Sequence, residues 1–354
     1  MKNPAHLFNE PHLFNKVQQR KPSYRLALCA VVLAAGVIAL GAFTRLVDAG
    51  LGCPDWPGCY GQLMWPSGAE EISAAERAFP EAPVEMDKTW PEMVHRYFAT
   101  TLGVFAIALV VVAWRHRGPG QPLKLPLFLL GFVILQGLFG MWTVTLKLWP
   151  QVVTAHLLGG FATLSLLWLL TLRLSNSRWQ LHASKSELMR GLKSPAMLGL
   201  VIVVLQITLG GWTTSNYAAL ACPDLPTCQS QWLPAMDFAS GFNVIQGIGP
   251  NYLGGMMDND ARVAIHMSHR IGAILTLLYV GWLSLRLLAC SEPVLRRQGR
   301  LIGGVLLLQF GLGLSNILFH LPLLTTVSHN VMGALLLLTL VTLNYGLLSA
   351  GDKR

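Results

Sequence analysis

Long uncharged runs, separated by short charged segments, dominate the hydrophobic pattern of the chain. A helix needs about 20 apolar residues to cross a bilayer, and the runs that reach this length predict eight spans. They lie at Leu26–Thr44, about Met93–Trp114, Leu125–Leu146, Val152–Leu172, Pro195–Ser215 and about Arg262–Arg286, with two more in Leu301–Gly351, which His320-Leu321-Pro322 divides. The composition agrees, because 12% of residues are charged against about 25% in soluble domains. We therefore predict an all-α polytopic membrane protein.

The positive charges are distributed unevenly between the two sides of these spans. An even number of spans puts both termini on one side, and the segments on that side hold 19 of the 26 Lys and Arg residues. The opposite side holds 13 of the 17 acids. The positive-inside rule then places both termini on the cytoplasmic side of a bacterial-type inner membrane. The net charge of +9 thus reports topology and not a nucleic-acid partner. Met1–Arg25 is polar and lacks the apolar core of a cleavable signal peptide.

Several features recur at nearly constant offsets along the chain. The offset is 169 from Cys53 to Cys222, 173 from Gln136 to Gln309 and from His156 to His329, and 174 from His95-Arg96 to His269-Arg270. We predict two tandem four-helix bundles that are parallel repeats, because an even number of spans per unit preserves orientation. The predicted parts are a cytoplasmic segment 1–25, an N-terminal bundle 26–174, a cytoplasmic linker 175–194 and a C-terminal bundle 195–350.

The cysteines fall into outer pairs and inner single residues. Cys53-Pro-Asp-Trp-Pro-Gly-Cys59 and Cys222-Pro-Asp-Leu-Pro-Thr-Cys228 lie in the predicted outer loops, whereas Cys29 and Cys290 lie toward the cytoplasm. An oxidising exterior produces this distribution, and the prolines favour tight turns that bring the sulfurs together. We predict disulfides Cys53–Cys59 and Cys222–Cys228, with either a structural or an electron-carrying role. A metal site is the alternative, although neither ring has a nearby histidine.

Each even-numbered predicted span carries a histidine near its outer end. These are His95, His156, His269 and His329. Facing helices of a bundle meet in its core, so the four imidazoles predict two pairs, one per bundle. Two histidines are the ligand set of a bis-histidine haem, and nearby glycines would let a flat macrocycle approach; these are Gly103, Gly159-Gly160, Gly272 and Gly333. The alternatives are hydrogen bonding across helices and a zinc or copper site. We expect His6, His12, His116 and His182 to be solvated in cytoplasmic segments and His320 to be a polar surface residue in the turn between the last two spans, with a functional contact as the alternative.

Three arginines lie at the same outer level as these histidines. They are Arg45, Arg96 and Arg270. Guanidinium groups bind carboxylates in a bidentate manner, which suits haem propionates. The alternative for each arginine is simple snorkelling at the membrane interface.

Together these motifs resemble those of the haem A synthase family over nearly the whole chain. The resemblance is carried by Thr44-Arg45-Leu46, Gly50-Leu51-Gly52-Cys53-Pro54-Asp55-Trp56-Pro57, Glu92-x-x-His95-Arg96, the three later histidines and the second cysteine ring. It implies a haem O substrate between His95 and His156, and a haem b cofactor whose iron is bound by His269 and His329. The implied reaction oxidises the C8 methyl group of haem O to a formyl group by successive hydroxylations and loss of water. The implied partners are an electron donor or acceptor, haem O synthase, cytochrome oxidase subunits, membrane lipid and further copies of the chain.

Glu92 distinguishes the first histidine site from the second. It stands three residues before His95, where His266 stands before His269. Residues at i and i+3 share one helix face, so a carboxylate beside a bound ring could accept a proton or stabilise positive charge. We predict that Glu92 is catalytic. The alternative is a stabilising acid at the positive end of a helix dipole.

Two other classes of function compete with this prediction. A di-haem b-type cytochrome would need the same histidines, although their common depth does not suit electron transfer across the membrane. A transporter with parallel repeats would need charge pairs and broken helices in mid-membrane, which the sequence lacks.

Overall fold

A computed structural model describes residues 21–118, 121–176, 179–182 and 186–353. Within these residues, eight helices are long and apolar enough to cross a membrane. They are α1 (Tyr24–Leu46), α3 (Met86–Arg115), α4 (Lys124–Thr145), α5 (Pro150–Leu174), α6 (Ser186–Ser215), α8 (Asn259–Leu288), α9 (Pro293–Leu318) and α10 (Leu323–Ser349). The all-helical membrane fold predicted from the hydrophobic pattern is thus confirmed. Residues 1–20, with His6 and His12, and parts of the linker 175–194 lie outside the described residues.

Three of the helices begin well before their predicted first residues. We predicted starts at Met93, Pro195 and Leu301, whereas α3, α6 and α9 begin at Met86, Ser186 and Pro293. The hydrophobic pattern marks only the apolar part of a helix, and these extensions are polar. Their ends are held locally, as where the Lys88 ammonium pairs with Glu85 at 2.6 Å. Pro91 and Pro195 therefore lie inside helices rather than at their starts.

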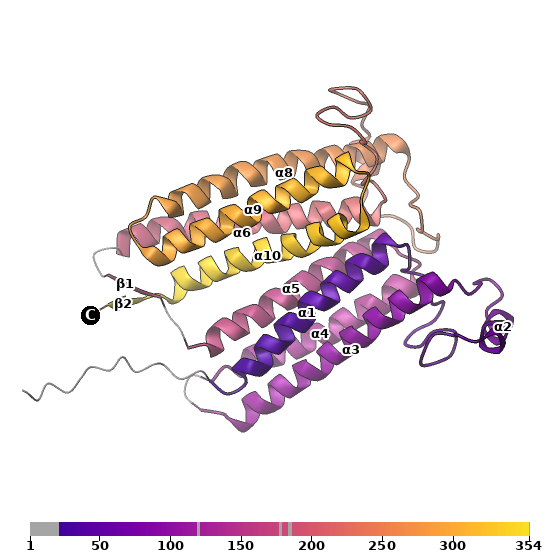
Figure 1. Ribbon diagram of the computed structural model, residues 1–354, viewed down its shortest axis with the longest axis horizontal. Coiled ribbons are helices and arrows are strands. Elements are labelled where there is room, and N and C mark those ends of the chain that lie inside the picture. Colours follow the sequence, from indigo (N-terminus) through magenta and orange to yellow (C-terminus); the bar gives the residue numbers. More distant parts are fainter. Residues whose placement is uncertain (1–20, 119–120, 177–178, 183–185, 354) are drawn as a thin grey trace, which may run out of the picture.

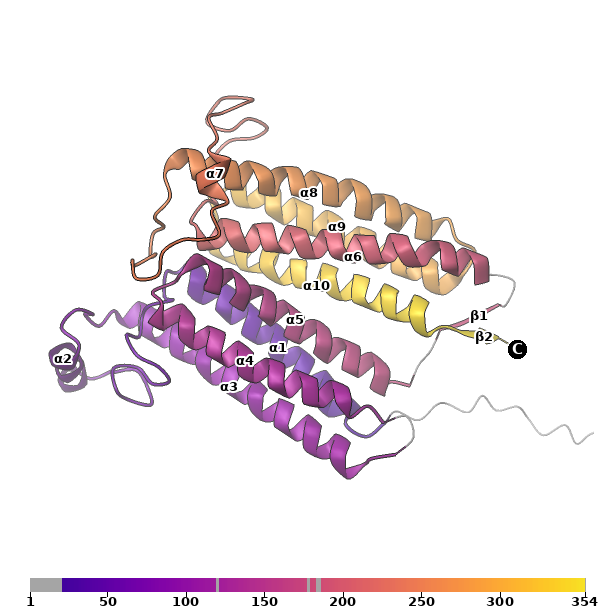
Figure 2. The same cartoon turned by 180° about the vertical axis from the view of Figure 1, so that it is seen from behind.

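The helices form two groups that lie side by side (Figures 1 and 2). One group contains α1, α3, α4 and α5, and the other contains α6, α8, α9 and α10. Leucines fill both interiors, including Leu109 and Leu164 in the first group and Leu283 and Leu340 in the second, each at most 2% exposed. Large apolar side chains such as Val32, Val104 and Leu307 point outward, as expected of helices that face lipid.

Helices α1 and α5 join the first group to α6 and α10 of the second. Polar contacts in the junction link helices of the two groups. The Thr154 and Ser215 hydroxyl groups lie 2.9 Å apart, and the Trp168 indole N–H donates to the Thr342 hydroxyl at 2.8 Å. Small residues let the backbones approach: a Cβ atom added at Gly211 of α6 would lie 3.4 Å from Thr154 and 3.5 Å from Leu157 of α5.

The two long loops lie at one end of the molecule, which we call the disulfide end. The first loop contains α2 (Ala69–Ala78) and the second contains α7 (Phe238–Gly241); the hydrophobic pattern predicted neither helix. Near the opposite end, β1 (Gln180–His182) pairs in parallel with β2 (Gly351–Lys353). These three-residue strands were also unpredicted, because pairing between the linker and the tail depends on how the two groups pack. His182 belongs to β1.

Candidate functional site

The four predicted histidines lie on α3, α5, α8 and α10, near the disulfide end. Each imidazole lies over a glycine of a neighbouring helix. A Cβ atom added at Gly41 of α1 would lie 2.9 Å from Cε1 of His95. The corresponding distances are 3.2 Å from Gly140 to His156, 3.2 Å from Gly210 to His269 and 3.1 Å from Gly313 to His329. The missing side chains give each ring its place, since a Cβ atom that close to another atom requires something to move.

Three of the four histidines also contact a glutamine. Nε2 of Gln136 lies 3.0 Å from Nδ1 of His156, and Nε2 of Gln206 lies 3.0 Å from Nδ1 of His269. Each of these amides also donates to the backbone carbonyl oxygen of the same histidine, at 2.5 Å and 3.0 Å respectively. The glutamines thus link each ring to the neighbouring helix.

The third glutamine determines the tautomer of His329. Nδ1 of His329 lies 3.2 Å from the backbone carbonyl oxygen of Gln309. A carbonyl oxygen only accepts hydrogen bonds, so Nδ1 carries the proton and the lone pair is on Nε2. In this tautomer Nε2 carries the lone pair with which an imidazole binds a metal, and the Gln309 amide nitrogen lies 3.3 Å from it.

His95 differs from the other three histidines in its surroundings. Val37 stands where the offset of 169 would place the counterpart of Gln206. Nδ1 of His95 is buried and makes no hydrogen bond to any residue that the structure describes. His95 and His156 stand on α3 and α5 of the first group, and His269 and His329 stand on α8 and α10 of the second. Each group of helices therefore contains two of the four imidazoles.

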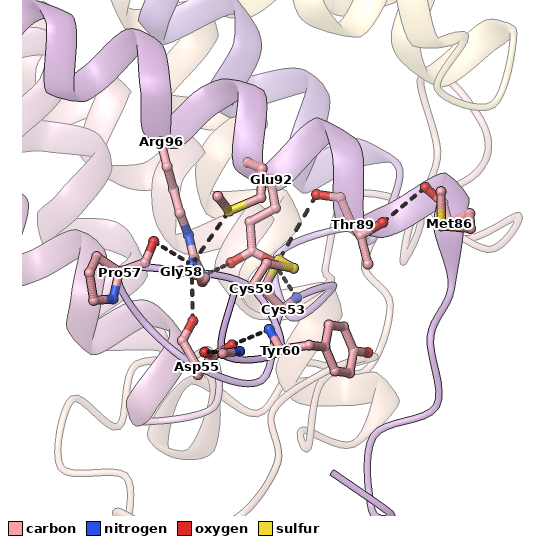
Figure 3. Close-up of a disulfide and its surroundings, with 12 residues drawn as sticks. Cys53, Asp55, Pro57, Gly58, Cys59, Tyr60, Met86, Thr89, Glu92 and Arg96 are labelled. Atoms are coloured by element: carbon pink, nitrogen blue, oxygen red, sulfur yellow. Dashed lines mark hydrogen bonds and ion pairs between the residues drawn. A yellow bond between two sulfur atoms is a disulfide. The ribbon is translucent and has the colours of Figure 1, made fainter. Parts of the chain in front are cut away.

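Glu92 and Arg96 fasten the first cysteine ring to α3 (Figure 3). Glu92 is 4% exposed, and its carboxylate forms an ion pair with Arg96 and accepts a hydrogen bond from the Cys53 N–H at 2.9 Å. Arg96 also donates to the carbonyl oxygens of Asp55 at 2.9 Å and Gly58 at 2.5 Å. Glu92 is thus held one turn before His95, with both carboxylate oxygens engaged.

The second cysteine ring is held in a similar way by Arg270. Its guanidinium donates to the carbonyl oxygens of Cys222 at 2.7 Å, Asp224 at 2.8 Å and Thr227 at 2.9 Å. His266, at the position of Glu92, donates from Nδ1 to the carbonyl oxygen of Ala218 at 2.9 Å. The second site therefore has the arginine clamp without the carboxylate.

Both predicted disulfides are present, Cys53–Cys59 and Cys222–Cys228. Asp224 stabilises the second ring. Its side chain accepts hydrogen bonds from the Thr227 hydroxyl and from the backbone N–H groups of Gln229 and Ser230. These hydrogen bonds, that from Thr227 foremost, hold the pKa of Asp224 below its usual range.

Arg45 lies between the two groups of helices. It donates to the Thr214 carbonyl oxygen at 2.8 Å, lies over the Tyr217 ring at 3.9 Å and pairs with Asp48 at 3.3 Å. Tyr217 in turn donates to Asp48 at 3.2 Å. The propionate roles predicted for Arg45, Arg96 and Arg270 remain predictions, since each guanidinium has these contacts within the protein.

The glycines that face the histidines were missed by sequence reasoning. Those singled out as following a histidine have other neighbours: an added Cβ atom would meet Gln136 at Gly159 and Gln206 at Gly272, and nothing within 4 Å at Gly103. A signal was present, because Gly41 and Gly210 are 169 residues apart and Gly140 and Gly313 are 173 apart, like the cysteines and histidines.

The chain is similar to known proteins over most of its length. A family model described as COX15-CtaA, cytochrome oxidase assembly protein, matches residues 24–341. A heme A synthase of Shewanella oneidensis is 47% identical over 309 residues, which cover 87% of this chain and 92% of that protein. A heme A synthase of Caulobacter vibrioides is 27% identical over 337 residues, which cover 88% of this chain and 93% of that protein. The matches span both groups of helices, and the chain belongs to the COX15-CtaA family of cytochrome oxidase assembly proteins.

Proposed function

We propose that this protein is a haem A synthase that oxidises the C8 methyl group of haem O to a formyl group. The observation that carries the proposal is the pair of similar histidine sites of which only the first has a carboxylate, Glu92, one turn before its histidine. Family membership and the heme A synthase relatives support it. In this proposal the protein spans the bacterial inner membrane several times, with both termini in the cytoplasm.

The second site suits a haem b cofactor on the chemistry of its donors. The tautomer of His329 puts the lone pair that would bind iron on Nε2, where the Gln309 amide nitrogen lies at 3.3 Å and would have to yield its place, and His269 is the partner ligand. An imidazole that binds through Nε2 needs an acceptor for its Nδ1 proton, and the buried Oε1 of Gln206, which has no partner among the described residues, becomes that acceptor when the amide rotates by half a turn. When bound, haem b supplies one-electron redox chemistry.

The first site receives the substrate haem O between His95 and His156. Those two residues orient the macrocycle, and Gly41 and Gly140 leave room for their rings. Each of two oxidations takes two electrons from the methyl carbon and adds one oxygen atom, with either dioxygen as the oxidant or water as the oxygen source and an external electron acceptor. The first gives an alcohol and the second a gem-diol, which loses water to become the formyl group. Glu92 stabilises positive charge at the methyl carbon and accepts the proton released there. Arg96 and the Cys53 N–H keep its carboxylate in position.

Pigment analysis tests the proposed function. The protein is expressed in cells that make haem O but lack another haem A synthase, and the extracted pigments are separated. We expect haem A in the extract. Haem b alone, with haem O unchanged, would instead support a di-haem b-type cytochrome that transfers electrons. Growth with isotopically labelled water then identifies whether the formyl oxygen comes from water or from dioxygen.

A further inference from the structure

An apolar groove runs between α4 and α5, beside the first histidine site. Its volume is about 260 Å³, and its walls are Phe132, Leu135 and Phe139 of α4 and Ala155, Gly159 and Ala162 of α5. The three small residues on α5 follow one another at helical spacing, which leaves the space that the aromatic side chains of α4 border. Leu135, at 43% exposed, lies at the outer edge.

Gln136 makes the groove continuous with the histidine site. It lines the groove and contacts the His156 ring at 3.0 Å. Its amide lies where a side chain on α5 would otherwise project, because a Cβ atom added at Gly159 would be 2.0 Å from Oε1 of Gln136. A group that extends from a ring beside His156 would therefore enter the groove directly.

The corresponding positions of the second group of helices carry larger side chains on α10. At the offset of 173 that relates His156 to His329, Ala155, Gly159 and Ala162 correspond to Ser328, Met332 and Leu335. On α9, Phe132 and Phe139 correspond to Val305 and Leu312. The small-residue stripe and its aromatic wall thus belong to the first site alone.

The two haems of the proposed reaction differ in a matching way. Haem O carries a long apolar hydroxyethylfarnesyl chain where haem b carries a vinyl group. We propose that the groove between α4 and α5 binds this isoprenoid chain of haem O. The inference rests on the proposed function, which places haem O in the first site.

Binding of the isoprenoid chain in the groove would also determine which methyl group of the macrocycle reacts. The chain and the C8 methyl group are attached to neighbouring pyrrole rings, so fixing one fixes the rotation of the macrocycle and the edge that faces Glu92. Lipid tails are as apolar as the groove, so binding there depends on close packing rather than on escape from water. Filling the groove should therefore weaken haem O binding and should leave binding of a haem without the chain unchanged.

The test is Ala162→Leu, which introduces the residue found at position 335. The purified protein, with its resident haem b, is titrated with haem O and separately with additional haem b. We expect Ala162→Leu to weaken haem O binding at least tenfold and to leave haem b binding at the first site unchanged. Ala162→Ser and Leu335→Ala are matched controls that should bind haem O as the unaltered protein does. The spectrum of the resident haem b reports correct folding of each variant.

Two results would overturn the proposal. Unchanged haem O affinity in Ala162→Leu would mean that a lipid acyl chain or nothing occupies the groove, and an equal loss of haem O and haem b binding would mean that the substitution damages the histidine site. Failure of the proposed function is distinct, since the unaltered protein would then yield no haem A whatever the variants bind.

Discussion

Glycine 41 shows how an absent side chain can define a binding site. The His95 ring occupies the space that a Cβ atom at this position would take, at 2.9 Å from Cε1. A helix interior gains up to about 1 kcal/mol from Gly→Ala when space allows. The cost of an alanine at position 41 should therefore appear as a displaced His95 ring and not as a less stable α1.

We expect Gly41→Ala to weaken haem O binding about tenfold, which corresponds to about 1.4 kcal/mol. Gly36→Ala is the matched control on the same helix, because an added Cβ atom there meets nothing within 4 Å. Absorbance titration and thermal unfolding measure the two effects separately. Equal affinities of the two variants would show that the Gly41 contact does not position His95.

Glu92→Gln keeps an acceptor for the Cys53 N–H but removes the negative charge. We expect haem A formation to fall by about 10²-fold or more, the usual range for loss of an acid–base group, while both haems remain bound. Glu85→Gln is the control at the same helix end, where Glu85 pairs with Lys88 and is half-exposed. Full activity of Glu92→Gln would refute the catalytic assignment.

At the residue scale, the sequence predicted the groups with distinctive chemistry better than their neighbours. Cys53 and Cys59 pair as predicted, and the four histidines lie at one end of the molecule. The contacts of Gly41 and Gln136 could not be read in advance, because they depend on the rotation of one helix against the next. That rotation depends on how whole helix faces pack against each other. A membrane helix is apolar on every face, so its sequence does not mark the face that packs.

At the scale of elements, each cysteine ring is a cap on the end of a membrane helix. Arg96 of α3 and Arg270 of α8 hold the rings by their backbone carbonyl groups. The predicted helix ends were less accurate than the predicted spans, as at Met86 and Ser186, because hydropathy responds to lipid contact and not to the polar turns beyond it.

The second cysteine ring, Cys222–Cys228, should become less stable in acid. Hydrogen bonds from Thr227 and two backbone N–H groups lower the pKa of Asp224, so its stabilising contribution is present above the unfolded value of about 4 and is lost as the pH falls through the lower folded value. Reduction of Cys222–Cys228 by a water-soluble phosphine should accelerate as the pH falls below about 4. Asp224→Asn supplies the control, since this variant should lose the acceleration. A pH profile identical in both proteins would assign no role to Asp224.

At the scale of the whole molecule, the charge distribution predicts which end faces the cytoplasm. A fluorescent protein fused to the C-terminus should fluoresce, and a phosphatase inserted at Ser67-Gly68, in the first long loop, should be active outside the cytoplasm. Active phosphatase at the C-terminus would reverse the topology and place the disulfides in a reducing compartment.

Gly210 and Gly211 join the two histidine sites laterally. Gly210 makes room for His269, and Gly211 packs against Thr154 and Leu157 of α5, next to His156. Electrons exchanged between the sites would therefore move parallel to the membrane plane. The membrane potential acts only on charge moved along the membrane normal, at about 2.3 kcal/mol per charge per 100 mV. Collapsing the potential with an ionophore should thus leave this exchange unchanged, whereas a slowed exchange would show that it has a component across the bilayer. A cell that has lost its membrane potential could then still transfer electrons between the two sites.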